Sequence, residues 1–156
     1  LLMSLSYNVA VAELLREVPF PSLYTAHSTT VRSDYCNAAT EVKDCYLCFR
    51  ISGGEDNAYL NTVVEAKQSI DCSFINNSEL CYGSVRINKC YQAFFSQDCE
   101  DCNEIWFSKD LSGCSNCIGC INLRGQQYHI FNKPVTKEEY KQFMTIIEES
   151  EEKDRN

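Results

Sequence analysis

The chain has 156 residues, of which 44% are hydrophobic and 23% are charged, a composition that fits one soluble globular domain. Its net charge of -8 at pH 7 disfavours direct binding to a nucleic-acid backbone or to an anionic membrane. No uncharged apolar run is long enough for a transmembrane helix, and the 9 Tyr and 8 Phe exclude an intrinsically disordered chain. With only 2 His, most catalytic designs that depend on imidazole are also removed.

The N-terminal segment, residues 1–32, is predicted to hold a helix over residues 4–17. Its apolar side chains fall near one face, and they are Leu5, Val9, Leu14 and Leu15. Pro19 and Pro21 stop the run. No basic region or small-residue cleavage site precedes this helix, so we expect no signal peptide, a cytoplasmic location and reduced thiols. The first residue is Leu1 rather than Met, and a fragment of a longer protein is therefore one interpretation.

The eleven cysteines follow one spacing rule, because all of their positions are multiples of three. They are Cys36, Cys45, Cys48, Cys72, Cys81, Cys90, Cys99, Cys102, Cys114, Cys117 and Cys120. From Cys36 to Leu123 this phase holds only small or aliphatic residues, apart from Asn57, and the charged and aromatic residues fall on the other two phases. Neither the helical period of about 3.6 nor the strand period of about 2 explains this pattern. We therefore expect the cysteine phase to face a narrow core.

A longer step of nine residues joins many of these cysteines, as in Cys72, Cys81, Cys90 and Cys99. A fixed step that recurs along the chain is typical of a solenoid. Because a nine-residue coil is too tight to enclose side chains, we predict about five coils of two such units, or about 18 residues, each. The predicted fold class is mainly β, a right-handed parallel β-helix over residues 33–126, with coils ~4.8 Å apart and a length of about 24 Å.

Residues 18 apart are then expected to stack in columns along the solenoid. The predicted columns are Cys72 with Cys90; Cys81 with Cys99 and Cys117; and Cys102 with Cys120. The outward Tyr and Phe are expected to stack as ladders between coils, as cross-strand aromatic pairs do. Asp and Asn directly before a cysteine suit the turns, and they are Asp44, Asp71, Asp98 and Asn116.

The C-terminal segment, residues 127–156, is predicted to contain a last strand within residues 127–132 and then a helix. Thr136 and Glu139 form a capping box that starts this helix. Its apolar stripe is Tyr140, Phe143, Met144 and Ile147. Residues 148–156 are expected to form a frayed acidic tail. We expect the helices of the two end segments to cap the solenoid, whose raw edges must be covered.

Metal binding is the sharpest chemical hypothesis, because several cysteines have the Cys-x-x-Cys spacing of zinc sites. The candidate ligands are Cys99, Cys102, Cys114, Cys117 and Cys120. However, one rule places all eleven cysteines and needs no metal, so a buried core ladder that includes Cys36, Cys45, Cys48, Cys72, Cys81 and Cys90 is favoured. The expected cofactor is therefore none, with zinc as the alternative.

Two other uses of the thiols are less favoured. Disulfides between stacked columns conflict with the odd number of cysteines and with the missing secretion signal. Nucleophilic catalysis lacks a base, because His27 and His129 lie outside the repeat and a buried thiol has a raised pKa. We expect no enzymatic activity.

From Ser33 onward the sequence resembles a group of uncharacterised cysteine-rich nonapeptide-repeat proteins of uncultivated small-genome bacteria and phages. The matching segments are 45–49, 78–82, 98–102, 114–124, Tyr128, 130–133 and 137–140. The resemblance implies a β-solenoid and no reaction. It also implies that a zinc-binding segment precedes a solenoid of this kind in many members. Positions at which such repeats usually have Cys are Gly54, Val63 and Ser108 here.

The leading functional hypothesis is a non-enzymatic structural or interaction solenoid that offers an aromatic and acidic face to a protein partner. One alternative is a thiolate metal-binding protein of the zinc type. The other is an acidic, DNA-mimic-like inhibitor of a DNA-binding protein. Because solenoid ends and faces often self-associate, a homo-oligomer is a further open alternative.

Overall fold

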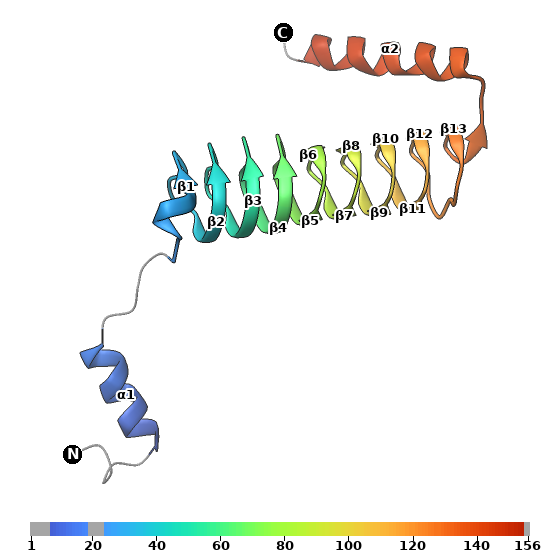
Figure 1. Cartoon of the computed structure of the whole chain (residues 1–156). Helices are drawn as coiled ribbons and strands as arrows, with labels where there is room; N and C mark the ends of the chain where they lie inside the picture. The colour runs from blue at the N-terminus through green and yellow to red at the C-terminus, as the bar shows by residue number, and fades with distance from the viewer. Residues whose placement is uncertain (1–6, 19–23, 155–156) are drawn as a thin grey trace.

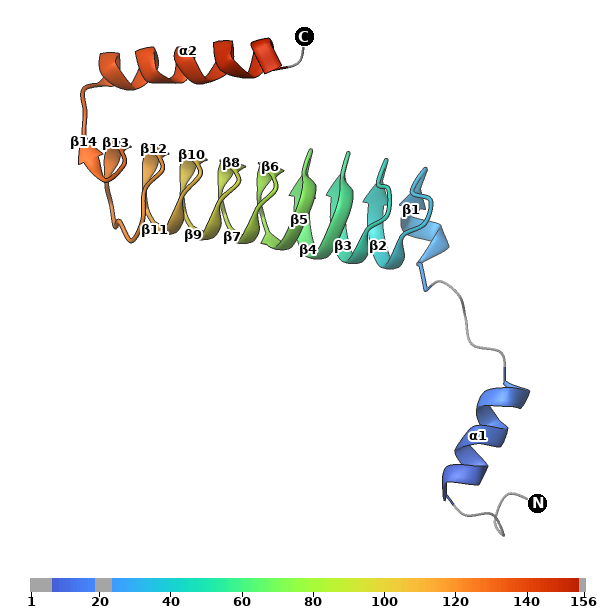
Figure 2. The same cartoon turned by 180° about the vertical axis from the view of Figure 1, so that it is seen from behind.

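The computed structural model describes residues 7–18 and 24–154, and it is a long β-solenoid with a helix at each end of the chain (Figures 1 and 2). The predicted fold class is confirmed. The helices are α1 (Tyr7–Glu17), the short 3-10 helix η2 (His27–Thr29) and α2 (Lys137–Asp154). Residues 4–6 of the predicted first helix and both prolines, Pro19 and Pro21, lie outside the described residues.

The strands of the solenoid form one continuous sheet that winds along the chain. They are β1 (Thr30–Val31), β2 (Asn37–Lys43), β3 (Phe49–Glu55), β4 (Ala58–Lys67), β5 (Ile70–Asn76), β6 (Glu79–Tyr82), β7 (Val85–Asn88), β8 (Tyr91–Phe94), β9 (Gln97–Glu100), β10 (Asn103–Trp106), β11 (Lys109–Ser112), β12 (Ser115–Ile118), β13 (Gln127–Ile130) and β14 (Lys133–Pro134).

Each coil contains 12 residues rather than the predicted 18. The parallel register pairs Thr30 with Val42 in the first coils, Cys81 with Ala93 in the middle and Cys117 with His129 in the last. The 101 residues from Thr30 to Ile130 therefore make more than eight coils, not five. At ~4.8 Å per coil the solenoid is about 40 Å long. The coils also extend slightly beyond the predicted limits of 33 and 126.

The twelve-residue coil has four short sides because the backbone turns at every third residue. The residue directly before each inward-facing one has a positive φ, and values from 44° to 64° recur at thirty non-glycine positions. A residue in this left-handed region bends the chain sharply between two extended segments. Asp44, Asp71, Asp98 and Asn116 all occupy such corners, with φ of 53° to 55°, so their predicted turn role is confirmed.

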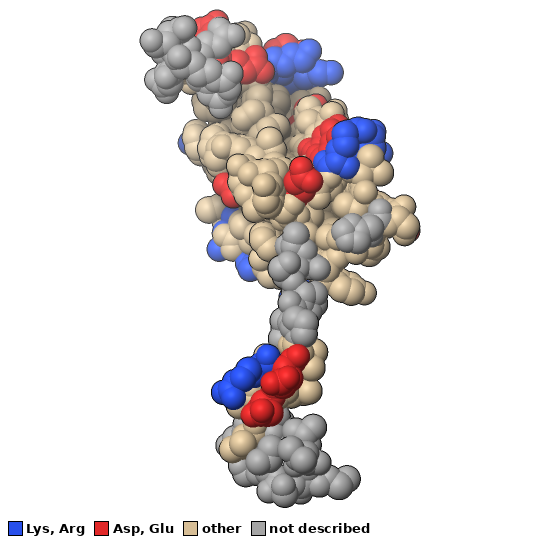
Figure 3. All heavy atoms as spheres, turned by 90° about the vertical axis from the view of Figure 1, so that its left-hand side faces the viewer, with Lys and Arg blue, Asp and Glu red and all other residues tan. Residues whose placement is uncertain are grey.

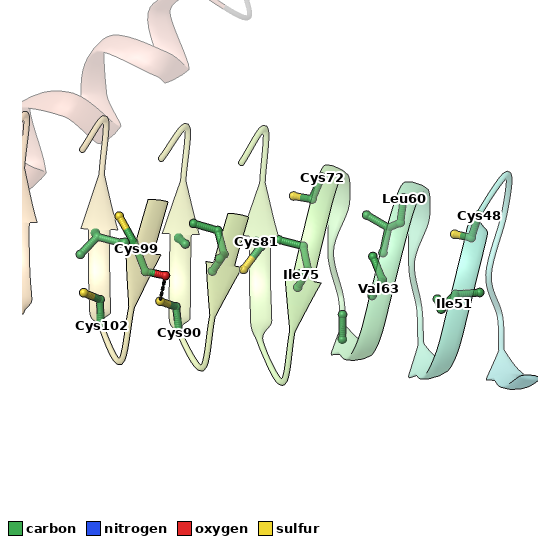
Figure 4. Packing of buried hydrophobic residues seen from close by; sticks show 14 of the residues in the cluster. Cys48, Ile51, Leu60, Val63, Cys72, Ile75, Cys81, Cys90, Cys99 and Cys102 are labelled. Carbon is green, nitrogen blue, oxygen red and sulfur yellow. Dashed lines mark hydrogen bonds between the residues drawn. The ribbon is translucent and has the colours of Figure 1, made fainter. Parts of the chain in front are cut away.

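The core is a narrow column of inward side chains, four from each coil (Figure 4). Along one corner it is mainly aliphatic, and the residues stacked there include Ile51, Val63, Ile75, Ile87 and Leu111. The other three corners carry mostly Cys, Ser and Ala. This arrangement explains why the inward phase tolerates only small or aliphatic residues.

Neither long helix covers an end of the solenoid in the way that was expected. In both views α1 lies away from the coils, and α2 turns back and runs alongside them (Figures 1 and 2). The edge of β13 is instead covered by the antiparallel strand β14, which contains Pro134. A proline has no N–H to offer, so it suits such an edge. No described helix is both long and apolar enough to cross a membrane.

The start and apolar stripe of α2 agree with the predictions. The Glu139 carboxylate accepts a hydrogen bond of 2.7 Å from the Thr136 N–H, and the Thr136 hydroxyl accepts one of 3.2 Å from the Glu139 N–H. Tyr140 is buried, and Phe143, Met144 and Ile147 are half-buried. The predicted frayed tail is wrong up to Asp154, where the helix ends, because the Glu- and Lys-rich sequence favours a helix.

Candidate interaction face and the buried cysteines

One side of the solenoid, which we call the aromatic face, carries apolar outward residues on every coil. It consists of the outward pairs 34–35, 46–47, 58–59, 70–71, 82–83, 94–95, 106–107, 118–119 and 130–131. Asp34 and Asp71 are its only charged residues. Several of its large side chains are half exposed or more, such as Tyr59 at 55% and Phe131 at 64%. A contiguous apolar surface of this kind is typical of an interaction site.

The aromatic rings form the ladders that the sequence predicted. The rings of Phe94 and Trp106 stack with centroids 4.2 Å apart, and those of Phe95 and Phe107 stack at 5.3 Å. Each of these pairs is separated by one twelve-residue coil. Gly83 allows the Phe95 ring to lie close to the preceding coil, since a Cβ at residue 83 would be 2.9 Å from that ring. The ladder thus fixes the rings in a regular array on a rigid backbone.

The other sides carry most of the charge, arranged as pairs between neighbouring coils. The Arg32 guanidinium forms two hydrogen bonds of 2.6 Å with Asp44, and it holds the pKa of that carboxyl below its usual value. Arg86 binds Asp98 in the same way on another side. Seen from the N-terminal end, basic and acidic side chains lie next to one another, with uncharged surface between the pairs (Figure 3). Most of the charge therefore lies away from the aromatic face.

All eleven cysteines are buried free thiols, and those labelled in Figure 4 point into the core. Their nine-residue step corresponds to one coil of 12 residues less one corner of three. Cysteines nine apart therefore lie on neighbouring corners of successive coils, as Cys90 and Cys99 do, and the Cys90 sulfur lies 3.5 Å from the Cys99 carbonyl oxygen.

The predicted columns of residues 18 apart are therefore wrong. Cys72 stacks on Leu60 rather than on Cys90, and Cys81 stacks on Ala93 rather than on Cys99. Cys117 lies between Ile105 and His129. The predicted pairing of Cys102 with Cys120 fails for the same reason.

The inward cysteines and serines make one recurring hydrogen bond that explains their abundance. Each of the eleven thiols donates to the carbonyl two residues before it, as Cys72 does to Ile70 at 3.1 Å. Buried serines do the same, and Ser96 donates to the Phe94 carbonyl at 2.9 Å. Several serine hydroxyls also accept from the inward N–H one coil later. Small side chains with one donor thus satisfy the backbone at the corners.

Asn57 is the exception in the inward phase, and its side-chain amide forms the hydrogen bonds to the backbone that a thiol or hydroxyl forms elsewhere. Its Nδ2 donates to the Ala66 carbonyl at 2.7 Å, and its Oδ1 accepts from the Ser69 N–H at 3.0 Å. Gly54 leaves room for that amide, because a Cβ there would be 2.7 Å from Asn57 Nδ2.

Burial keeps the isolated thiols protonated at neutral pH. It raises the pKa of Cys72 to about 11 and that of Cys81 and Cys99 to about 12. Where two thiols lie together, their pKa values move apart. The hydrogen bond with Cys90 lowers the pKa of Cys102, whereas the same bond and burial raise the pKa of Cys90. Protonated, buried thiols are poor nucleophiles.

The five candidate metal ligands are distributed over all four corners of the coil. Cys102 and Cys114 share a corner, while Cys99, Cys117 and Cys120 each occupy a different one. In residues 7–18 and 24–154, no group of three or more His, Cys, Asp and Glu side chains is placed to hold a metal ion.

His129 lies within the inward phase and not outside it. It is buried at the corner of Cys117, and its Nδ1 lies 3.0 Å from the Gln127 carbonyl, which matches the bond that the cysteines make. Its position is a multiple of three, and this signal could have identified it from the sequence. The side chain of His27 is outside the described part.

We expect Cys72→Ala to lower the free energy of unfolding by about 1 kcal/mol, because it removes a small buried side chain and a donor. Cys72→Ser should cost less, since Ser84 and Ser96 already use a hydroxyl at the same corner. Urea unfolding of the two variants and the wild type measures both effects. A serine variant less stable than the alanine variant would show that the donor has no part in the stability.

A scan against models of known protein families and a search of characterised proteins found no match to this chain.

Proposed function

We propose that the protein is a non-enzymatic interaction scaffold, a rigid solenoid whose aromatic face binds another protein. The observation that carries the proposal is the composition of that face. Each of its outward pairs holds at least one apolar residue, Asp34 and Asp71 are its only charged residues, and Tyr35, Phe107 and Phe131 are at least half exposed. Exposed aromatic residues on a rigid surface lose little conformational freedom on binding, and they are enriched among the residues that dominate protein interfaces.

Rigidity supports a scaffold role. Every coil is hydrogen-bonded to the next through the parallel strands, and the inward thiols and hydroxyls bond the corners. The ion pairs between coils, such as Arg32 with Asp44, lie on other sides and leave the aromatic face nearly free of charge. The same separation favours a partner with an apolar surface. Metal binding and mimicry of DNA stay as alternatives without an observation that favours them.

The test replaces two exposed rings by residues that keep the backbone. Phe95 and Phe107 occupy corners with φ of 50°, and Asn adopts such a conformation more readily than other non-glycine residues. We expect Phe95→Asn/Phe107→Asn to lower capture of a protein partner by at least about tenfold, as the loss of aromatic anchors does at other interfaces. Immobilised protein is exposed to an extract of the cells that produce it, and bound proteins are quantified.

The matched control is Glu65→Asn/Lys89→Asn, which changes two exposed corners on a different side and leaves the net charge unchanged. It should retain the partner that the wild type captures. Equal capture by the wild type and both variants would contradict binding at the aromatic face.

A further inference from the structure

The helix α1 carries an apolar stripe that is open to solvent. This α1 stripe consists of Val11, Leu14, Leu15 and Val18, whose spacing places them on one side of a helix. Val18 follows directly after α1 and continues its hydrogen bonding, because its N–H donates to the Leu14 carbonyl at 2.9 Å. Leu14, Leu15 and Val18 are each about half exposed. In both views α1 lies away from the coils, so the stripe faces no other element there (Figures 1 and 2).

A helix as short as α1 depends on packing for its stability. It has 11 residues, and isolated helices shorter than about 12–15 residues are marginal in water. Its first turn holds no acidic residue, and its ion pair between Glu13 and Arg16 is exposed and adds little. Most helix stability in folded proteins comes from burial of an apolar side. The α1 stripe therefore requires an apolar surface against which to pack.

The N-terminal part of the aromatic face offers such a surface. Its large side chains are Tyr35, Tyr46 and Tyr59, which we call the tyrosine ladder and which come from three successive coils. Neighbouring rings pack edge to face with centroids 5.8 Å apart, and the three side chains are 44% to 63% exposed. Asp34 and Asp71 lie at the two ends of this stretch of the face, and the residues between them on the face carry no charge.

The chain enters the solenoid beside the tyrosine ladder. The Tyr24 N–H donates a hydrogen bond of 2.8 Å to Asn37 Oδ1, and Asn37 follows Tyr35 by two residues. Tyr24 therefore lies at the border of the aromatic face. The six peptide units between Val18 and Tyr24 span at most about 21 Å. This reach is sufficient to bring α1 over the first coils of the aromatic face of its own chain.

We propose that α1 docks its apolar stripe on the tyrosine ladder of its own chain and covers the N-terminal part of the aromatic face. At ~1.5 Å per residue α1 is about 17 Å long, and coils ~4.8 Å apart place Tyr35 and Asp71 at a similar separation. Because its C-terminal end is held near Tyr24, the docked helix directs its N-terminus toward Asp71. A carboxylate near a helix N-terminus is stabilising, so the charges complement each other.

The short connection favours the same chain over a second copy. A short tether gives an effective concentration on the order of millimolar, which a second copy at micromolar concentration does not match. The docked helix does not extend to Phe95 and Phe107, which lie further along the same face. That part stays open to a partner. The inference thus goes beyond the proposed function and does not depend on it.

Hydrogen–deuterium exchange of the α1 amides, followed by mass spectrometry of the full chain, tests the docking. A docked helix exchanges mainly when it undocks, whereas a free helix of this length exchanges rapidly. We expect Tyr35→Asn/Tyr59→Asn to speed exchange within residues 7–18 by at least about tenfold. Both tyrosines occupy corners with φ of 57° to 58°, which Asn adopts readily. The control Phe95→Asn/Phe107→Asn makes the same change further along the face and should leave this exchange unchanged.

The helix itself provides the reciprocal test. Leu14→Gln/Leu15→Gln should also speed exchange of α1, because Gln has nearly the helix propensity of Leu but does not bury an apolar side chain. The control Glu13→Gln/Arg16→Gln changes the opposite side of α1 and leaves the net charge unchanged. It should retain the slow exchange of the wild type.

Three results would overturn the proposal. One is rapid exchange of α1 in the wild type, equal to that in Tyr35→Asn/Tyr59→Asn. Another is slow exchange that this variant retains, because the stripe would then pack elsewhere. The third is slow exchange that is lost on dilution by about a hundredfold, which would place α1 on a second copy. Partner capture at Phe95 and Phe107 is a separate measurement, so either proposal can fail while the other stands.

Discussion

Gly54→Ala should destabilise the protein by about 3 kcal/mol or more, because the new methyl group meets atoms that cannot move away. A Cβ at residue 54 would lie 2.8 Å from the Ala66 carbonyl oxygen and 2.7 Å from Asn57 Nδ2. Both atoms belong to the same buried hydrogen bond. The φ of 149° at Gly54 adds backbone strain that a side chain makes worse. Urea unfolding followed by circular dichroism measures the effect.

The matched control is Gly125→Ala. The φ of Gly125 is 59°, and no atom lies within 4 Å of the added Cβ. The only remaining cost is therefore the strain of a non-glycine residue in the left-handed region, about 1 kcal/mol. If Gly54→Ala does not fold, the double variant Gly54→Ala/Asn57→Ala should recover part of the stability, because it removes one of the two clashes. Equal stability of the Gly54→Ala and Gly125→Ala proteins would contradict the close packing at this corner.

Stability should fall steeply as the pH rises above about 9, where thiols in the unfolded chain ionise. Burial raises the folded-state pKa of Cys72 to about 11 and of Cys81 to about 12, from an unfolded value of 9.0. Between these values the unfolded chain releases protons that the folded chain keeps, so a rising pH favours unfolding. The contribution is fully present below pH 9 and is lost as pH rises toward 11 to 12. Each such thiol adds a slope of about 1.4 kcal/mol per pH unit.

The experiment compares unfolding in urea at pH 7, 8, 9 and 10 for the wild type and for Cys72→Ser/Cys81→Ser. Because Tyr and Lys also titrate in this range, the variant isolates the contribution of the two thiols. Above pH 9, the free energy of unfolding of the variant should fall by about 3 kcal/mol less per pH unit than that of the wild type. Parallel curves for the two proteins would mean that these thiols are not protected in the folded state.

The solenoid itself was predictable because its core is narrow. The inward phase, the aromatic ladders and the corners at Asp44 and Asp98 were all visible as a period of three. The coil length was not predictable, because a period of three is compatible with a coil of any whole number of sides. The nine-residue step of the cysteines favoured coils of 18, whereas four left-handed corners per turn give 12.

The position of α2 beside the coils could not be predicted from the sequence. The capping box at Thr136 and the stripe from Tyr140 to Ile147 define a helix with an apolar side, but they do not say against which surface it lies. Only the turn after β14 directs α2 back along the coils (Figure 2). The inward position of His129 was not predicted because the predicted repeat ended at Leu123, although the inward phase continues to residue 129.

A scaffold function requires that the eleven cysteines are structural core residues. Titration of free thiols, with metal analysis of protein purified without chelator, tests this claim directly. We expect no bound metal, eleven thiols that react only after denaturation, and no effect of a chelator on the unfolding transition. About one zinc ion per chain, together with thiols that a chelator exposes or unfolding that it promotes, would contradict the scaffold and favour a thiolate metal-binding protein.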